Sequence, residues 1–222
     1  MNIKGAIFDM DGTLVESLGV WNFLHEQLGN KYCGKPFEVS AEFDKALRTV
    51  TLIESADMIR KEFGIEESSE DIYKYAQTLV TYYYEQYTSM KDGAVEYLEY
   101  LHKNNVKMCI ASATEKKEIE YCLKKFGIDK YFDRVISCCD VGKSKEFPDV
   151  FIAAQKAIGT ELEQTWVFED SLVALKTASK AGFKTVGIYD KFNFGHDEMK
   201  RTVDIYIDEN QTLMDIVYDA HP

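Results

Sequence analysis

The chain has 222 residues, of which 45% are hydrophobic and 29% charged, a composition typical of a globular protein with a buried core. With 26 Lys and Arg against 38 Asp and Glu, its net charge is −12, which argues against nucleic acid or an anionic membrane surface as a partner. The length accommodates one large domain, or one domain that carries a smaller insertion.

Short apolar segments alternate with helical patterns along most of the chain. Residues 3–8 form a continuous apolar run, which suits a strand buried on both faces of a parallel sheet. Similar runs occur at residues 106–111, 134–137, 165–168 and 184–188. Helical periodicity occurs between them, at residues 94–102, 115–126, 148–158 and 171–181. This alternation predicts an α/β fold with a doubly wound, mainly parallel sheet.

A long excursion separates the first predicted strand from the second. Residues 15–90 show helical periodicity and almost no strand signal. The candidate helices span residues 17–28, 40–50, 53–63 and 71–87. Because so long a segment is unusual for a loop, we expect an inserted all-helical domain at 15–90, with the α/β core formed by 1–14 and 91–222.

Two carboxylates follow the first predicted strand, in the sequence Asp9-Met10-Asp11-Gly12-Thr13. In open α/β sheets, ligands bind beyond the carboxyl ends of the strands, and a turn at Gly12 would bring Asp11 back towards that point. Two such carboxylates repel each other, and a divalent cation with a preference for oxygen ligands, such as Mg²⁺, would relieve the repulsion. The alternative interpretation is an ordinary Asp-Gly turn in which Asp11 caps a helix.

Three further segments carry polar groups at comparable positions. Ser112-Ala113-Thr114 ends the second core strand with a hydroxyl followed by backbone N–H groups, although Ser and Thr also commonly cap helices. Lys145 precedes a helix that begins near residue 148. Glu169 and Asp170 end the fourth core strand, where acidic residues could also simply favour a helix N-terminus.

Taken together, these segments resemble the motifs of the haloacid dehalogenase-like (HAD) hydrolase superfamily, and they occur in the family's order. The resemblance covers essentially the whole chain, and an insertion directly after the first motif is similar to the family's helical cap. The layout is most similar to the β-phosphoglucomutase/phosphatase-like subgroup. The resemblance implies a Rossmann-like core sheet with strand order 3-2-1-4-5 and an inserted helical cap domain.

The resemblance also implies roles for individual residues. Asp9 would attack phosphorus to form an aspartyl-phosphate, and Asp11 would act as general acid and base. The residues implied for catalysis are Asp9, Asp11, Ser112 and Lys145. Those implied for Mg²⁺ are Asp9, Asp11 through its backbone carbonyl, Asp170 and, directly or through water, Glu169. Those expected near the substrate are Gly12, Thr13, Ala113, Thr114, Glu16 and Trp21.

Two of these assignments leave alternatives open. Many relatives have Gly-Lys-Pro-x-Pro-Asp, so counting forward from Gly142 selects Lys143, whereas counting back from Pro148 selects Lys145. We favour Lys145, because the Pro-Asp helix start fixes the local geometry. Trp21 could stack on a sugar or base ring, or it could pack between the cap helices.

Among the family's activities, Asp11 argues against a dehalogenase, because cleavage of a carbon–halogen bond needs no acid to protonate an alkoxide. The β-phosphoglucomutases carry a cap His where Trp21 stands and a cap Arg in a segment that here reads Thr51-Leu52-Ile53-Glu54-Ser55. We therefore expect a Mg²⁺-dependent phosphatase for a small phosphorylated metabolite. The alternatives are a phosphosugar mutase, in which Arg48 or Arg60 compensates, and a non-catalytic protein that binds phosphorylated ligands.

The five cysteines and four histidines show no zinc-ligand spacing. The odd number of cysteines and the absence of a Cys-x-x-Cys motif also argue against a disulfide framework. We expect a reduced, cytoplasmic protein whose adjacent Cys138 and Cys139 end the third strand as buried small hydrophobes.

Overall fold

A computed structural model of the chain describes residues 3–48 and 50–219. Its contacts divide the chain into two compact units. The core unit comprises Met1–Leu18 and Ser89–Pro222, and the cap unit comprises Gly19–Thr88. The chain leaves the core unit after β2 (Val15–Glu16) and returns through β3 (Ser89–Met90), and these two strands pair antiparallel.

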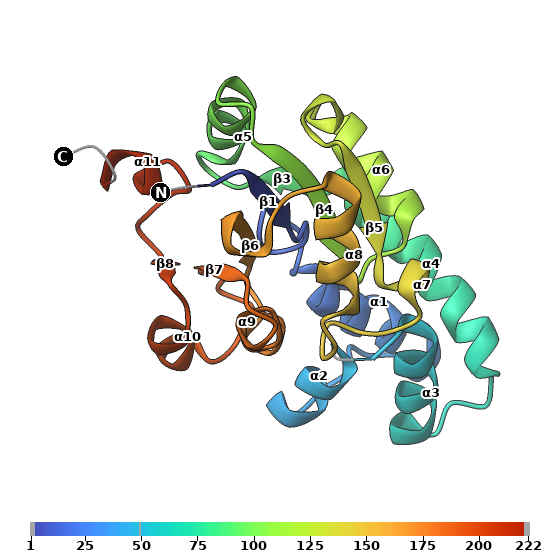
Figure 1. Cartoon of the computed structure of the whole chain (residues 1–222). Helices are drawn as coiled ribbons and strands as arrows, with labels where there is room; N and C mark the ends of the chain where they lie inside the picture. The colour runs from blue at the N-terminus through green and yellow to red at the C-terminus, as the bar shows by residue number, and fades with distance from the viewer. Residues whose placement is uncertain (1–2, 49, 220–222) are drawn as a thin grey trace. The chain divides into compact units, whose positions relative to one another are not determined.

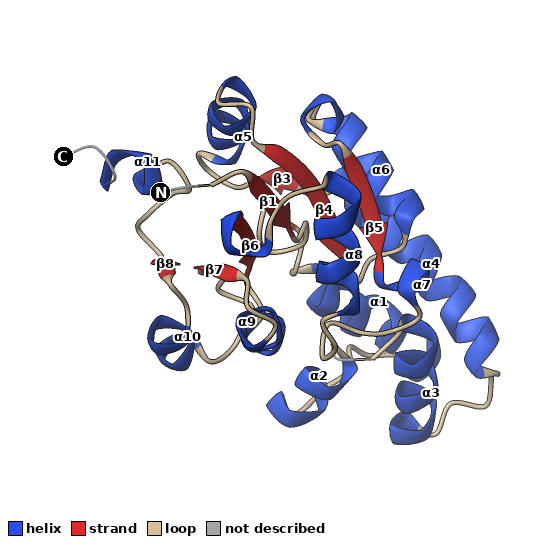
Figure 2. Ribbon diagram, in the orientation of Figure 1, coloured by secondary structure: helices blue, strands red, loops and turns tan. Residues whose placement is uncertain are grey.

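The core unit is built on a six-stranded sheet in which every neighbouring pair is parallel (Figures 1 and 2). The strands are β1 (Gly5–Phe8), β4 (Lys107–Ser112), β5 (Arg134–Ser137), β6 (Thr165–Glu169), β7 (Lys184–Ile188) and β8 (Ile205–Ile207). Their spatial order is β5-β4-β1-β6-β7-β8. The predicted fold class is therefore confirmed, and β8 extends the expected order by one short strand at the edge.

Helices cover both faces of this sheet, as the continuous burial of its central strands requires. The helices described in the core unit are α5 (Ala94–Lys103), α6 (Lys116–Lys125), α7 (Cys138–Val141), α8 (Asp149–Ile158), α9 (Leu172–Lys180), α10 (His196–Thr202) and α11 (Asp215–Asp219). Two 3₁₀ turns, Asp129–Tyr131 and Leu162–Gln164, precede β5 and β6. Cys138 and Cys139 belong to α7 and not to the strand, and only Cys138 is buried, so the prediction for Cys139 was wrong.

Alternate side chains of β1 belong to opposite faces of the core. Ile7 packs in a cluster with Phe151 and Ala154 of α8 and Ala178 of α9. On the other face, the Phe8 ring stacks on Phe168 with centroids 4.3 Å apart and meets the edge of Tyr97 of α5 at 6.4 Å. Burial of a large apolar side chain such as Ile7 or Phe8 contributes about 1.5–3 kcal/mol, so β1 is fixed from both sides.

The winding of the sheet reverses at β1, which pairs with β4 on one side and with β6 on the other. The chain proceeds from β1 to β4 and β5 in one direction, and then from β6 to β7 and β8 in the other. Such a reversal opens a crevice at the carboxyl ends of the adjacent strands. The residues that follow β1, β4 and β6 therefore converge on one place.

Among its described residues, the cap unit contains the helices α1 (Val20–Cys33), α2 (Ala41–Leu47), α3 (Leu52–Phe63) and α4 (Ser69–Gln86). Hydroxyl side chains cap three of their N-termini. Ser40 and Ser68 accept hydrogen bonds from backbone N–H groups of the first turn, and Thr51 forms a capping box with Glu54. The sequence therefore specifies where these three helices begin.

The first cap helix spans Val20–Cys33, whereas residues 17–28 were predicted, and it continues through Gly29. The helix ends at Gly34, which adopts a left-handed conformation with φ of 71°. Gly29 is buried where the backbone of Lys35 and Phe37 crosses the helix, and a Cβ there would overlap backbone atoms of both residues. Close approach of two chain segments thus explains the glycine.

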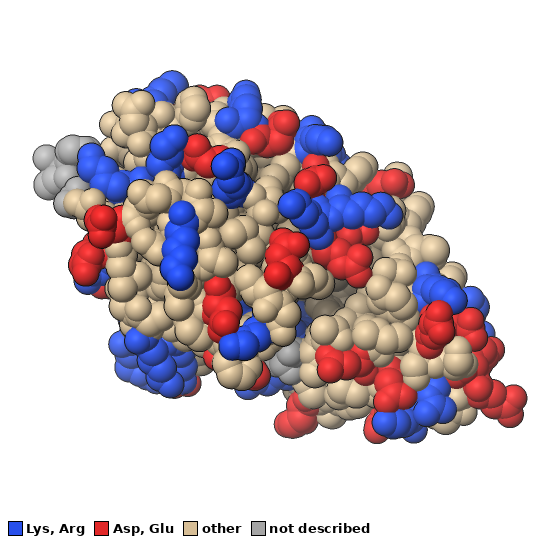
Figure 3. Space-filling view, turned by 45° about the vertical axis from the view of Figure 1, so that its right-hand side comes forward, with Lys and Arg blue, Asp and Glu red and all other residues tan. Residues whose placement is uncertain are grey.

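Lys and Arg side chains are interspersed with Asp and Glu over the face shown in Figure 3. Within the described part of the chain, no helix combines the length and the apolarity needed to cross a membrane.

We predict that Gly29→Ala lowers the thermal stability of the protein, because the added methyl group must displace the backbone of Lys35 and Phe37. Overpacking of this kind costs about 1–3 kcal/mol. Asn30→Ala is the matched control, since Asn30 is the next residue of the same helix and is exposed. Thermal unfolding followed by circular dichroism measures both variants, and equal midpoints for them would contradict the close-packing argument.

Candidate active site

Three buried carboxylates meet at the reversal point of the sheet. Asp9 follows β1, and its N–H donates to the carbonyl oxygen of Phe168 in β6 over 2.9 Å, so the β-ladder places it directly. Glu169 is the last residue of β6, and Asp170 follows it. One oxygen from each of Asp9, Glu169 and Asp170 lies within 4.8 Å of the others. All three residues are at most 5% exposed.

Lys145 is the cation that faces this cluster. Its Nζ donates to the carboxylate of Asp9 and, over 2.6 Å, to Glu169. The lysine side chain is only 11% exposed. Lys143, the alternative from the sequence, instead pairs with Asp149 at 2.9 Å and is 49% exposed. The structure thus places Lys145, and not Lys143, beside the strand-end carboxylates.

The cluster has an excess of negative charge. Burial raises the pKa of Asp9 to about 7, although Lys145 opposes the shift. Burial, reinforced by Glu169 and Asp9, also holds the pKa of Asp170 well above its ordinary value. Burial alone would lower the pKa of Lys145, but Asp9 and Glu169 outweigh it and raise that pKa.

This donor set fits a divalent cation. Three ionised carboxylates opposite one ammonium group would leave two unbalanced negative charges in a buried place, which is costly without a counter-ion. Carboxylate oxygens are the ligands that hard divalent ions prefer. Asp9, Glu169 and Asp170 are therefore the residues that could hold a metal ion.

The Asp11 carboxylate, two residues after Asp9, has different partners. One of its oxygens accepts a hydrogen bond from the Ser17 hydroxyl, and the other accepts one from Thr114, each over 2.6 Å. Its side chain is not part of the carboxylate cluster described above. Adjacent acids of one motif are thus held in two environments, one beside an ammonium group and one between two hydroxyls.

The turn that follows Asp11 requires Gly12. Its φ of 77° is in the left-handed region, and a Cβ there would overlap the Asp170 carboxylate. The next residue, Thr13, is fully buried, and its hydroxyl donates to Asp170 Oδ1 over 3.2 Å. Gly12 and Thr13, which were expected near the substrate, therefore contact Asp170.

The segment after β4 forms a compact turn next to Asp11. Ser112 is fully buried, and its Oγ accepts a hydrogen bond from the N–H of Thr114 over 3.1 Å. The Ser137 hydroxyl holds the same turn by donating to the Thr114 carbonyl oxygen over 2.8 Å. Ala113, at the tip, is exposed.

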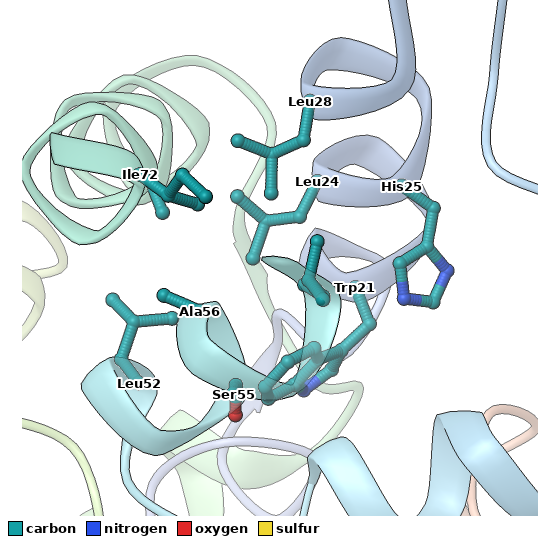
Figure 4. A pocket seen from close by; sticks show the side chains of 10 residues that line it. Trp21, Leu24, His25, Leu28, Leu52, Ser55, Ala56 and Ile72 are labelled. Carbon is teal, nitrogen blue, oxygen red and sulfur yellow. The ribbon is translucent and has the colours of Figure 1, made fainter. Parts of the chain in front are cut away.

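The other two residues expected near the substrate have partners within their own units. Glu16 lies 3.2 Å from Lys91 Nζ in the core unit. Trp21 lines a cavity of about 10 Å³ in the cap unit, together with Leu24, Leu52 and Ser55 (Figure 4). So small a cavity holds about one water molecule at most, and Trp21 is partly buried against the hydrophobic cluster of the cap unit.

Sequence reasoning missed two residues with direct contacts to these acids. Ser17 bonds to Asp11, and Asn193, in the loop after β7, donates to Asp170. Asn193 follows the carboxyl end of a core strand, but no motif singles it out. That topological position is the signal that could have identified it.

Comparison with known proteins establishes the class. Residues 6–188 match the model of the haloacid dehalogenase-like hydrolase family, and the chain belongs to that family. It is 23% identical to the phosphorylated carbohydrates phosphatase of Thermotoga maritima, covering 87% of this chain and 88% of that protein. It is 26% identical to a pyrophosphatase of Halalkalibacterium halodurans, covering 83% of each.

Solved structures show the same fold. The β-phosphoglucomutase of Clostridium difficile superposes with a TM-score of 0.78 at 19% identity, covering 98% of this chain and 96% of that chain.

We predict that the metal-free protein loses stability between about pH 4 and pH 7. Because the pKa of Asp9 rises from 3.8 to about 7 on folding, the folded state retains a proton that the unfolded state has released over this range. The stability contributed by this group is therefore full below pH 4 and falls as pH rises, by at most about 1.4 kcal/mol per pH unit.

Urea unfolding in EDTA at several pH values tests this dependence. Asp9→Asn is the matched control, because it lacks the titrating group and should show a shallower decline. The same slope in both proteins would contradict the prediction.

Proposed function

We propose that this protein is a Mg²⁺-dependent phosphatase that hydrolyses a small phosphorylated metabolite, such as a sugar phosphate, through an aspartyl-phosphate intermediate. The observation that carries the proposal is the pair Asp9 and Asp11. One carboxylate lies among metal-type ligands beside Lys145, and the other lies between two hydroxyls. Membership of the hydrolase family and relatives that are named phosphatases support it.

In the first half-reaction, a carboxylate oxygen of Asp9 attacks the phosphorus atom, and the bond from phosphorus to the substrate oxygen breaks. Asp11 donates a proton to that leaving oxygen. In the second half-reaction, Asp11 accepts a proton from water, whose oxygen attacks phosphorus and releases inorganic phosphate and free Asp9.

The remaining residues serve to position and neutralise the phosphoryl group. Lys145 and Ser112 bind its oxygens, together with the backbone N–H of Ala113. A bound Mg²⁺, held by Asp9 and Asp170 beside Glu169, would supply further positive charge to the phosphoryl oxygens. The hydroxyls of Ser17 and Thr114 fix the orientation of Asp11 until it exchanges a proton.

Three features favour hydrolysis over a mutase reaction, which would need a cationic cap residue for a second phosphate. Trp21 and Leu52 occupy the two positions expected to be His and Arg, and both line the small cavity of the cap unit. Arg48 pairs with Asp44 at 2.8 Å. Arg60 lies 3.5 Å from Asp57. Both arginines thus already have acidic partners.

We predict that the purified protein releases phosphate from one or more members of a panel of phosphorylated sugars and other phosphomonoesters, and that EDTA abolishes the activity. Asp9→Asn should remove it by at least about 10³-fold while circular dichroism remains unchanged, because an amide cannot act as the nucleophile.

A phosphate-release assay with added Mg²⁺ measures this. Tight binding of phosphate esters without turnover would overturn the phosphatase assignment. Interconversion of two sugar phosphates without phosphate release would indicate a mutase.

A second prediction separates the two lysines. Lys145→Ala should lower kcat/KM by about 10²-fold or more, because it removes the cation that faces Asp9 and the phosphoryl oxygens. Lys143→Ala is the matched control and should change kcat/KM by less than about threefold, since its partner is the partly exposed Asp149. A larger loss in the Lys143 variant, measured by steady-state kinetics, would reverse the assignment.

A further inference from the structure

The loop after β7 reaches back to the carboxylate cluster through Asn193. The Nδ2 group of Asn193 donates to the carbonyl oxygen of Asp170 over 2.8 Å and to its carboxylate Oδ2 over 2.7 Å. A side-chain amide has two N–H donors, so one residue can make both bonds. Because they join the main chain and the side chain of Asp170, they restrict the rotation of its carboxylate.

The orientation of the Asn193 amide is itself fixed. Its Oδ1 accepts a hydrogen bond from the N–H of Phe194 over 2.9 Å, so the Nδ2 side faces Asp170. The N–H of Asn193 donates to the carbonyl oxygen of Asp190 over 3.0 Å, which closes a tight turn. The amide is therefore held at both ends before any ligand binds.

A buried ion pair secures the turn that carries Asn193. Asp190 is 1% exposed, and its Oδ1 accepts a hydrogen bond from the N–H of Phe192 over 2.9 Å. Its Oδ2 accepts a bond from Lys91 Nζ over 3.0 Å, and the same ammonium group donates to the Tyr189 carbonyl oxygen over 3.0 Å. Lys91 directly follows β3, so a continuous set of contacts connects that strand with Asp170.

Each carboxylate oxygen of Asp170 thus accepts a hydrogen bond from one uncharged side chain. Thr13 donates to Oδ1 and Asn193 to Oδ2. Each carboxylate oxygen can accept about two bonds, so each still has a free direction for a cation. Neutral donors orient the group without cancelling its charge, which is what a metal ligand requires. Removing an outer partner of a metal ligand typically weakens metal affinity by about 10- to 100-fold.

We propose that Asn193 is a positioning residue that aims the Asp170 carboxylate at a divalent cation, and that the pair Lys91 and Asp190 holds the loop that presents it. This inference rests on the proposed function, because it requires a metal ion at the carboxylate cluster. Asn193 does not act on the substrate in this scheme, and its effect passes entirely through Asp170.

Direct metal binding by the full chain tests the proposal, with Mn²⁺ as the probe and its free concentration followed by electron paramagnetic resonance. We expect Asn193→Ala and Asn193→Leu to raise the dissociation constant about tenfold or more. Leu approximates the shape of Asn without its donors, so it separates lost hydrogen bonds from lost packing. Asn30→Ala, on the exposed side of a cap helix, is the control and should bind as the wild type does.

Steady-state kinetics provide a second readout. The two Asn193 variants should need about tenfold more Mg²⁺ for half-maximal activity and should approach the wild-type kcat when Mg²⁺ is saturating. If the wild-type protein binds Mn²⁺ and the Asn193 variants bind it equally well, the positioning role is overturned while the proposed function stands. If the wild-type protein binds no Mn²⁺, the proposed function fails first.

Discussion

The accumulation of negative charge at the carboxyl ends of β1 and β6 is the constraint on which the rest of the site depends. Asp9, Glu169 and Asp170 are buried within a few ångströms of one another, and Lys145 is the ammonium group that contacts two of them. Such an arrangement is costly in an apolar environment, and clusters of this kind are concentrated at functional sites. The parallel sheet holds these groups together, because its backbone ladder fixes where each strand ends.

The same backbone places two chemically identical side chains in two different environments. Asp9 continues the line of β1 and faces Lys145, whereas the turn at Gly12 gives Asp11 the hydroxyls of Ser17 and Thr114 as partners. Lys145 favours the charged form of Asp9, which a nucleophile requires, but burial outweighs this effect and raises the pKa of Asp9 to about 7. Asp11 instead accepts hydrogen bonds from two neutral hydroxyls. Two acids separated by one residue are therefore held in chemically different environments.

The sequence was sufficient to predict the parts of the site that backbone topology determines. Once the apolar runs were recognised as parallel strands, the residues that follow β1, β4 and β6 had to lie near one another, and the helix start at Pro148 favoured Lys145. The contacts of Asn193 and Ser17 depend on loop conformations that no periodicity encodes. The length of α1 was missed for a related reason, since Gly29 serves a tertiary contact that a local pattern cannot reveal.

The net charge of −12 disfavours a phosphorylated substrate at long range, but the charge balance within the carboxylate cluster determines whether a phosphoryl group can bind there. With its three carboxylates ionised and Lys145 protonated, the cluster carries two negative charges, and it would repel a phosphoryl group. A divalent cation brings that sum to zero, and it also favours the ionised form of Asp9 on which the proposed nucleophilic attack depends. Binding of the metal and binding of the phosphoryl group are thus expected to strengthen each other, because each supplies the charge that the other lacks. The acidic surface then weakens substrate binding little. Salt largely screens exposed charges that lie more than about 10 Å from the bound phosphoryl group, whereas charges in the buried cluster are screened much less.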